Sequence, residues 1–233
     1  MTRRLHHAPL PDAAAEVTPS PEAARHARVL RLREGDALVL FDGRGREADA
    51  RVIGVDPLRF AVEPARDAAE SGPRLVLCYA VPKGNKKLDQ VIRGATEVGV
   101  AAIHLTLTER CVARPDREAQ KKLERLARVA AEAARQSGRA TVPDLVAPAP
   151  LDEVAARAPD ESLRLVAAPG AEAFDGDGDE AWLVVGPEGG LSDAELEALS
   201  RRGFVPIGLG PTVLRTETAG VVAPAIVLDR LRR

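Results

Sequence analysis

VVGPEGGLSDAELEAL (184–199) and PIGLGPTVLRTETAG (206–220) are the two stretches that decide the fold of this chain. In each, an apolar run typical of a buried strand breaks into a loop rich in Gly and Pro and then leads into a predicted helix. Parallel α/β sheets hold nucleotide-like ligands in such loops, at the carboxyl ends of their strands. Neither loop matches GxGxxG or GxxxxGK[ST], so the common dinucleotide and P-loop motifs do not account for them. We therefore expect a different nucleotide-shaped ligand.

The two loops are expected to form one shared pocket. GPEGG (186–190) contains three glycines, which permit positive φ and leave no Cβ to obstruct a planar ligand. Ser192 and Glu195 have the spacing of a capping box, which predicts the start of a helix. The second loop leads into a predicted helix of apolar and small residues (216–231), interrupted by Pro224. Because the loops follow successive strands about twenty residues apart, we expect them to meet around one ligand.

The order GPEGG, helix, LGPTVLRTETA (209–219) resembles the SPOUT class of S-adenosylmethionine (AdoMet) methyltransferases. Within that class the chain resembles the RsmE family, which methylates N3 of a uridine in 16S ribosomal RNA. The resemblance extends almost from end to end. The other segments that carry it are RVLRLREGDALVLFDGRGREADARV (28–52), AVPKGNKKLDQVIRGATEVGV (80–100), TERCVARP (108–115) and AARQSGRATVP (133–143).

Two domains are expected in an α/β protein. Short strands over 37–63, with a hairpin turn at DGRG (42–45), indicate a small β-barrel. From residue 74 onward, strands alternate with helices, which predicts a mostly parallel sheet covered on both faces. VPDLVAPAP (142–150) is interpreted as a Pro-rich connection. The resemblance implies that residues 1–72 form a PUA-like RNA-binding β-barrel. It also implies that residues 73–233 form a SPOUT methyltransferase domain with a deep trefoil knot, which no sequence pattern would predict.

The resemblance implies that the cofactor is AdoMet, held in a slot lined by the backbone of the knotted loops. Methyl transfer from a sulfonium requires no metal, and none is expected. The expected cofactor-binding residues are Ala168, Pro169, Gly170, Gly186, Pro187, Glu188, Gly189, Gly190, Ile207, Leu209, Gly210, Val213, Leu214 and Thr216.

Two charged residues of the second loop are candidates for catalysis. Uracil N3 is a poor nucleophile while protonated, so a cation near the uracil oxygens would favour the reactive anion. Arg215 is the first candidate for that cation; the alternative is that it pairs with Glu217 or another acid to hold the knot. Glu217 is the candidate acceptor of the proton, with a structural ion pair as its alternative. Glu188 could orient the methionine amine or cap its own loop.

The charge distribution favours contact with RNA although the net charge is only −2. Residues 110–139 contain nine Lys and Arg against four acids, whereas residues 150–200 contain two Arg against thirteen acids. A basic stretch can contact phosphates, but it can also be an ordinary solvated helix face. The expected RNA-binding residues are Lys83, Lys86, Arg110, Arg135 and Arg139, and the expected partner is the 16S RNA of the small ribosomal subunit.

The remaining features indicate a cytoplasmic protein. Cys78 and Cys111 show neither metal-ligand spacing nor a disulfide framework. The N-terminal residues contain no continuous apolar run of a signal peptide, and no segment is apolar enough to span a membrane. The resemblance implies a homodimer.

Two other functions are considered beside a uridine-N3 methyltransferase. The first is a SPOUT RNA methyltransferase that acts on tRNA or 23S ribosomal RNA with the same cofactor slot. The second is a non-catalytic ribosome-assembly factor that binds RNA and has an inactive slot, which a test of AdoMet binding would distinguish. An unrelated nucleotide enzyme would need a phosphate cradle or an acidic residue at the end of the second strand, and the sequence offers neither.

Overall fold

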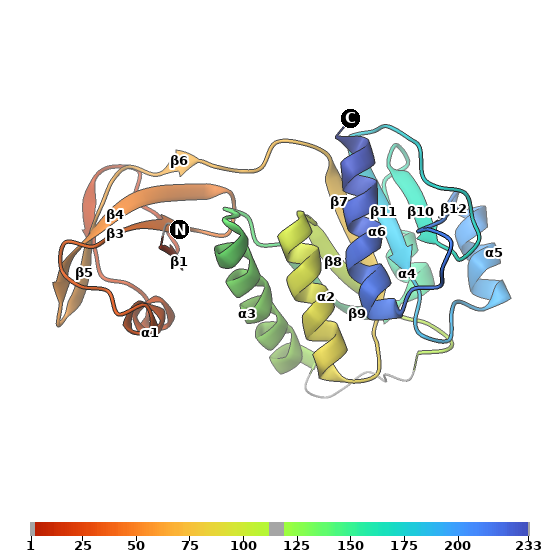
Figure 1. Cartoon of the computed structure of the whole chain (residues 1–233), viewed down its shortest axis with the longest axis horizontal. Helices are drawn as coiled ribbons and strands as arrows, with labels where there is room; N and C mark the ends of the chain where they lie inside the picture. Colours follow the sequence, from red (N-terminus) through yellow and green to blue (C-terminus); the bar gives the residue numbers. More distant parts are fainter. Residues whose placement is uncertain (1–2, 112–118, 233) are drawn as a thin grey trace. The chain divides into compact units, whose positions relative to one another are not determined.

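The computed structural model describes residues 3–111 and 119–232, which form two compact units (Figure 1). The first unit contains the residues up to Ser71 together with Ala131–Val142, and the second contains Gly72–Ala130 and the residues from Pro143 onward. Parts of the motif 108–115 and of the basic stretch 110–139 lie outside the described residues. The division into domains 1–72 and 73–233 stays a prediction.

Within the described residues, the first unit contains a six-stranded sheet, one complete helix and the C-terminal part of a second helix. The predicted hairpin is confirmed: two antiparallel strands are joined through DGRG, where Gly43 (φ 77°) and Gly45 (φ 98°) adopt positive φ. Two three-residue strands near the N-terminus were not expected, because they are too short to show an alternating pattern. The order is β1 (Arg4–His6), β3 (Ala37–Phe41), β4 (Arg46–Val55), β5 (Leu58–Val62), β2 (Ala15–Val17); β6 (Arg66–Asp67) also pairs with β4, and the complete helix is α1 (Pro21–Val29).

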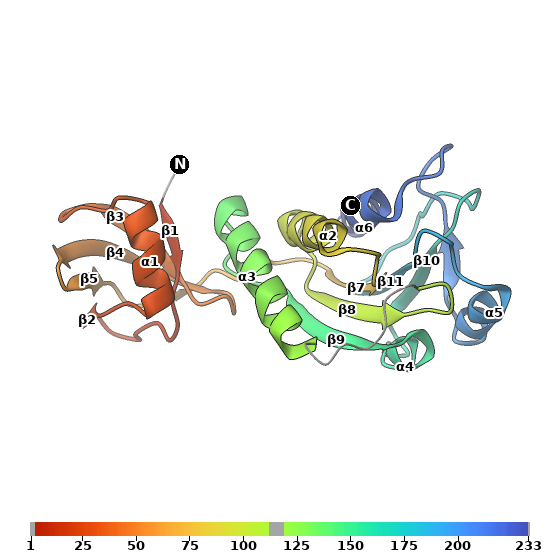
Figure 2. The same cartoon turned by 90° about the horizontal axis from the view of Figure 1, so that it is seen from below.

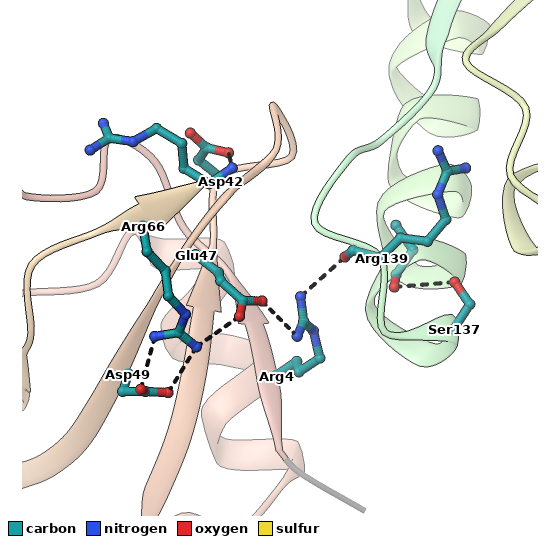
Figure 3. A network of polar contacts seen from close by, with 9 residues as sticks. Arg4, Asp42, Glu47, Asp49, Arg66, Ser137 and Arg139 are labelled. Atoms are coloured by element: carbon teal, nitrogen blue, oxygen red, sulfur yellow. Dashed lines mark hydrogen bonds and ion pairs between the residues drawn. The ribbon is translucent and has the colours of Figure 1, made fainter. Parts of the chain in front are cut away.

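A chain of ion pairs and hydrogen bonds joins the sheet of the first unit to the segment Ala131–Val142 (Figure 3). Arg4 lies between them: it pairs with Glu47 at 3.0 Å and donates to the carbonyl oxygen of Arg139 at 3.2 Å. Arg66 pairs with Glu47 and Asp49, both at 2.8 Å. The segment therefore belongs to this unit through contacts between residues far apart in the sequence.

The second unit contains a six-stranded sheet in which every described pairing is parallel, as the alternating pattern predicted. Its central strands β7 and β11 are almost wholly buried, which explains their continuous apolar sequences. The order is β12 (Val205–Ile207), β10 (Leu163–Ala167), β11 (Glu180–Val185), β7 (Arg74–Ala80), β8 (Ala102–Leu107), β9 (Asp144–Pro150).

Helices cover both faces of this parallel sheet. Figure 2 shows α2 (Asn85–Val98) and α6 (Thr216–Leu231) along one face, with α4 (Leu151–Ala155) and α5 (Asp193–Arg201) along the other. The capping box predicted at the start of α5 is confirmed, since Ser192 and Glu195 exchange both hydrogen bonds. The remaining helix, α3 (Ala119–Ser137), continues from the second unit into the first. None of the described helices combines the length and apolar character needed to cross a membrane.

The prediction that residues 142–150 form a connection is wrong, because most of them form strand β9. Pro148 and Pro150 have no N–H to donate, which normally argues against a strand. β9 tolerates them because, among the described strands, it lies at the edge of the sheet and pairs only with β8, with a register shift between His104 and Thr106 of β8. Prolines in an edge strand need not break a sheet.

α6 packs closely against α2 and β7 because glycines lie at the contacts. A Cβ on Gly220 would lie 2.8 Å from a ring carbon of Tyr79, and a Cβ on Gly94 would lie 2.6 Å from a methyl group of Val221. Pro224 lies inside a helix that remains continuous, so the predicted interruption is wrong. This packing fixes the first turn of α6 beside the carboxyl ends of the central strands.

The trefoil knot concerns how the chain is threaded, which the order of the strands does not define. The knot therefore stays a prediction.

Candidate active site

The predicted shared pocket is present as a cavity of about 740 Å³ at the carboxyl ends of β10, β11 and β12. One wall consists of the loop after β11, and the opposite wall consists of the loop between β12 and α6. The first turn of α6 closes the cavity, and Lys87 reaches it from α2. Two loops about twenty residues apart thus enclose one space.

Most of the expected cofactor-binding residues line this cavity, and their roles stay predictions. Those that line it are Ala168, Pro169, Gly186, Pro187, Glu188, Gly189, Gly190, Leu209, Gly210, Val213, Leu214 and Thr216. Gly170 lies in the adjoining turn, and Ile207 is buried in β12, so neither reaches the cavity. Residues that the sequence did not single out complete the lining: Lys87, Ala167, Val185, Leu191, Leu196, Thr212 and Ala219.

The loop that follows β12 and the loop that follows β10 approach each other closely at Gly208, next to residues that line the cavity. The Gly208 N–H donates to the carbonyl oxygen of Glu172 at 2.6 Å. A Cβ at position 208 would lie 2.0 Å from the carbonyl oxygen of Ala171, which is far inside van der Waals contact. Only glycine fits there, so the sequence of the second loop fixes its distance from the loop after β10.

Thr216 joins the start of α6 to the first Gly-rich loop. Its buried hydroxyl donates to the carbonyl oxygen of Gly186 at 2.8 Å and lies 3.3 Å from the hydroxyl oxygen of Tyr79. Burial raises the pKa of Tyr79 to about 12, so its hydroxyl is neutral at ordinary pH. The residue predicted as a cofactor ligand therefore also fixes the two walls relative to each other.

Three charged side chains meet inside the cavity. The ammonium of Lys87 lies 2.7 Å from Glu188 Oε1 and 3.5 Å from Glu217 Oε2. The hydrogen bond to Glu188 raises the pKa of Lys87, and the same bond lowers the pKa of Glu188. Lys87 was missed by the sequence analysis, although a signal was available. The first turn of α2 carries two lysines and no acid, against the usual preference of a helix N-terminus for negative charge.

Arg215 is exposed and precedes the first residue of α6. Within the described part of the chain its side chain makes no hydrogen bond and no ion pair. Glu217, with which Arg215 was alternatively expected to pair, is held by Lys87 instead. The guanidinium is thus left available to a ligand that enters the cavity.

The expected RNA-binding residues differ in how their side chains are engaged. Lys83 and Lys86 are exposed next to and within the first turn of α2. Arg110 donates to the carbonyl oxygens of Gly189 at 2.9 Å and Leu191 at 3.3 Å, so it supports the first Gly-rich loop. In the first unit, Arg135 pairs with Glu132 and Arg139 pairs with Glu70. Their contact with RNA stays a prediction.

Comparisons with known proteins agree with this architecture. A family model for an RNA methyltransferase domain matches residues 70–228, and one for an RNA methyltransferase PUA domain matches residues 20–64. The chain is 38% identical over 232 residues to ribosomal RNA small subunit methyltransferase E of Mycobacterium tuberculosis, with 92% of this chain and 86% of the relative covered. It is 32% identical over 211 residues to the Bacillus subtilis protein of that name, with 84% and 82% covered.

Solved structures match over nearly the whole chain. The crystal structure of ribosomal RNA small subunit methyltransferase E from Neisseria gonorrhoeae bound to S-adenosyl methionine superimposes with a TM-score of 0.91 at 27% identity, covering 99% of this chain and 98% of the other. A methyltransferase from Legionella pneumophila in complex with the cofactor SAM gives a TM-score of 0.87 at 31% identity, covering 98% of each chain.

Proposed function

This chain belongs to the RsmE family of ribosomal RNA methyltransferases, and from that membership we propose that it transfers a methyl group from AdoMet to N3 of a uridine in 16S ribosomal RNA. The α/β fold of the SPOUT class and the PUA-like N-terminal domain expected from the sequence are confirmed. The observation that carries the proposal is the single cavity between the two Gly-rich loops, with an unengaged Arg215 at its edge and two carboxylates inside.

The cavity suits AdoMet in size, polarity and charge. Small-molecule sites commonly enclose about 300–1,000 Å³. Leu191, Leu209 and Leu214 offer apolar surface to an adenine ring. Among the described residues, the backbone groups of 209–214 make no hydrogen bond, so they are available to bind the base and ribose. The carboxylates of Glu188 and Glu217 suit a ligand that carries an ammonium and a sulfonium.

The residues around the cavity can prepare uracil N3 for transfer. When bound, AdoMet supplies a methyl group on a positively charged sulfur, and loss of that methyl leaves the neutral thioether S-adenosylhomocysteine. The enzyme must hold N3 in line with the methyl group, and positioning alone contributes several kcal/mol. Arg215 would stabilise the negative charge that the uracil oxygens gain when N3 loses its proton. Glu217 lies inside the cavity, two residues after Arg215 in the sequence, and would accept that proton.

We propose that exposed lysines bring the RNA to this site. Lys83 and Lys86 lie beside Lys87 at the start of α2 and can contact phosphates. The partner of this surface would be the 16S RNA of the small ribosomal subunit, in the cytoplasm. A homodimer, implied by the sequence resemblance, belongs to the same proposal.

Methyl transfer to ribosomal subunits tests the proposal directly. Small subunits from a strain that lacks this protein are incubated with the enzyme and AdoMet labelled in its methyl group, and the RNA is analysed by nucleoside mass spectrometry. Label in 3-methyluridine of 16S RNA is the expected result. Label confined to tRNA or 23S RNA would assign a different substrate to the same fold. Failure to bind AdoMet would favour an assembly factor without catalytic activity.

A further inference from the structure

The described lining of the cavity carries two positive and two negative side chains: Lys87, Arg215, Glu188 and Glu217. The two cations differ in their surroundings. Arg215 is exposed and makes no contact with the acids, whereas the ammonium of Lys87 touches both of them. Lys87 is therefore the cation that partly neutralises the two carboxylates of the cavity before any ligand enters.

Glu217 depends on this contact more than Glu188 does. Its side chain is only 11% exposed, and within the described residues its buried Oε2 has no hydrogen bond besides the ion pair with Lys87. Glu188 is 41% exposed, so water also solvates it. A buried carboxylate with one partner at 3.5 Å retains the capacity to attract a second cation.

We propose that Lys87 sets how strongly this cavity distinguishes AdoMet from S-adenosylhomocysteine, an inference that rests on the proposed function. The two molecules differ by one methyl group and by the positive charge on sulfur. Lys87 neutralises one of the two carboxylates and repels a second cation, so it lowers the preference of the cavity for the charged cofactor. Without this lysine, the cavity would hold one net negative charge and would bind AdoMet more tightly, with little change for the neutral product.

This arrangement also has a consequence for catalysis. Transfer removes the positive charge from sulfur, so carboxylates that stabilise the bound cofactor more than the transition state would slow the reaction. A lysine already placed between the two acids limits that stabilisation. Lys87 acts here as a positioning and charge-balancing residue, and its effect is measurable in binding alone.

Isothermal titration calorimetry with AdoMet and with S-adenosylhomocysteine tests the inference without RNA or turnover. Lys87→Met keeps the length of the side chain and removes its charge. It should raise the ratio of AdoMet affinity to S-adenosylhomocysteine affinity about three- to tenfold, as expected for one charge several ångströms away in a partly solvated site. Lys87→Arg should keep the ratio of the unaltered protein. Glu217→Gln should move the ratio in the opposite direction by a similar factor.

The matched control is Lys86→Met, which removes the same charge one residue away, from an exposed side chain outside the cavity lining. It should leave the ratio unchanged. An unchanged ratio in Lys87→Met, or an equal rise in Lys86→Met, would overturn the inference. If Lys87→Met does not fold, Glu217→Gln tests the inference: a lower ratio of AdoMet affinity to S-adenosylhomocysteine affinity supports it, and an unchanged or higher ratio overturns it. Failure of the unaltered protein to bind either molecule would count against the proposed function instead.

Discussion

The guanidinium of Arg110 donates a hydrogen bond of 2.9 Å to the carbonyl oxygen of Gly189. The same nitrogen lies 3.3 Å from the carbonyl oxygen of Leu191. The Arg110 side chain also packs against Gly189, since a Cβ added to Gly189 would lie 3.4 Å from the Cβ of Arg110. The neighbouring Glu109 N–H is held by the carboxylate of Glu195 at 2.8 Å. This turn is thus attached to the Gly-rich loop through Arg110 and to the first turn of α5 through Glu109, so Arg110 fits a role in supporting the cofactor loop better than a direct contact with RNA.

Arg110→Ala should therefore weaken AdoMet binding about tenfold, equivalent to about 1.4 kcal/mol for the lost hydrogen bonds, while RNA affinity changes little. Calorimetry measures the first quantity and filter binding of 16S RNA the second. Lys83→Ala is the comparison variant and should show the reverse pattern, because its side chain is exposed and lies outside the cavity. Loss of RNA affinity with normal AdoMet binding in Arg110→Ala would restore the RNA-contact role.

Arg215→Ala should lower the rate of methyl transfer about 10²–10³-fold and leave AdoMet affinity within about threefold of the unaltered protein. The reason is that Arg215 is free of ion pairs within the described residues and is available to the uracil oxygens. Single-turnover transfer to small subunits and calorimetry of AdoMet binding measure the two effects. Equal loss of cofactor binding would mean that Arg215 holds the loop or the cofactor and does not stabilise the uracil anion.

Local signals in the sequence were sufficient for most of the fold. The capping box at Ser192 and Glu195 gave the start of α5, and the turn glycines gave the β3–β4 hairpin. β9 was missed because Pro148 and Pro150 have the composition of a loop. A strand can contain these prolines when it lies at the edge of a sheet, and the position of β9 at the edge is known only once the whole sheet is assembled.

The site residues that lie within the two loops could be predicted from the sequence. Lys87 was missed because its position depends on how two helices pack. Glycines and charges of the two loops indicated the cavity directly. Which lysine of α2 reaches that cavity depends on how α2 packs against α6, through the contact of Gly94 with Val221. Similarly, Glu70 is the partner of Arg139 although 69 residues separate them, so the engagement of that arginine could not be read from its neighbours.

Tyr79 provides a spectroscopic test of the buried contact at Thr216. Burial raises its pKa in the folded protein to about 12, compared with about 10 when it is exposed to water. The unfolded state therefore loses this proton first as the pH rises, so the contribution of Tyr79 to stability is complete below pH 10 and decreases between about pH 10 and 12. Because the chain contains one tyrosine, absorbance of the phenolate at about 295 nm reports this group alone.

The folded protein should show phenolate absorbance only near the upper end of that range, and protein unfolded in urea should show it near pH 10. Thr216→Val serves as the comparison variant, because it removes the hydroxyl 3.3 Å from Tyr79 and keeps the size of the side chain. Phenolate absorbance near pH 10 in the folded protein would mean that water reaches the Tyr79 hydroxyl.

Gly208→Ala should destabilise the second unit by about 3 kcal/mol. The added methyl group would lie 2.0 Å from the carbonyl oxygen of Ala171, and moving the two backbone segments apart would break the hydrogen bond from the Gly208 N–H to Glu172. Gly189→Ala is the control at a glycine of the other Gly-rich loop. Its Cβ would make only an ordinary contact with Arg110 at 3.4 Å, so the substitution should cost no more than about 1 kcal/mol. Urea unfolding of both variants gives the two free energies. Equal stability of the two variants would show that the two loops can separate at Gly208, and this glycine would then not fix the distance between them.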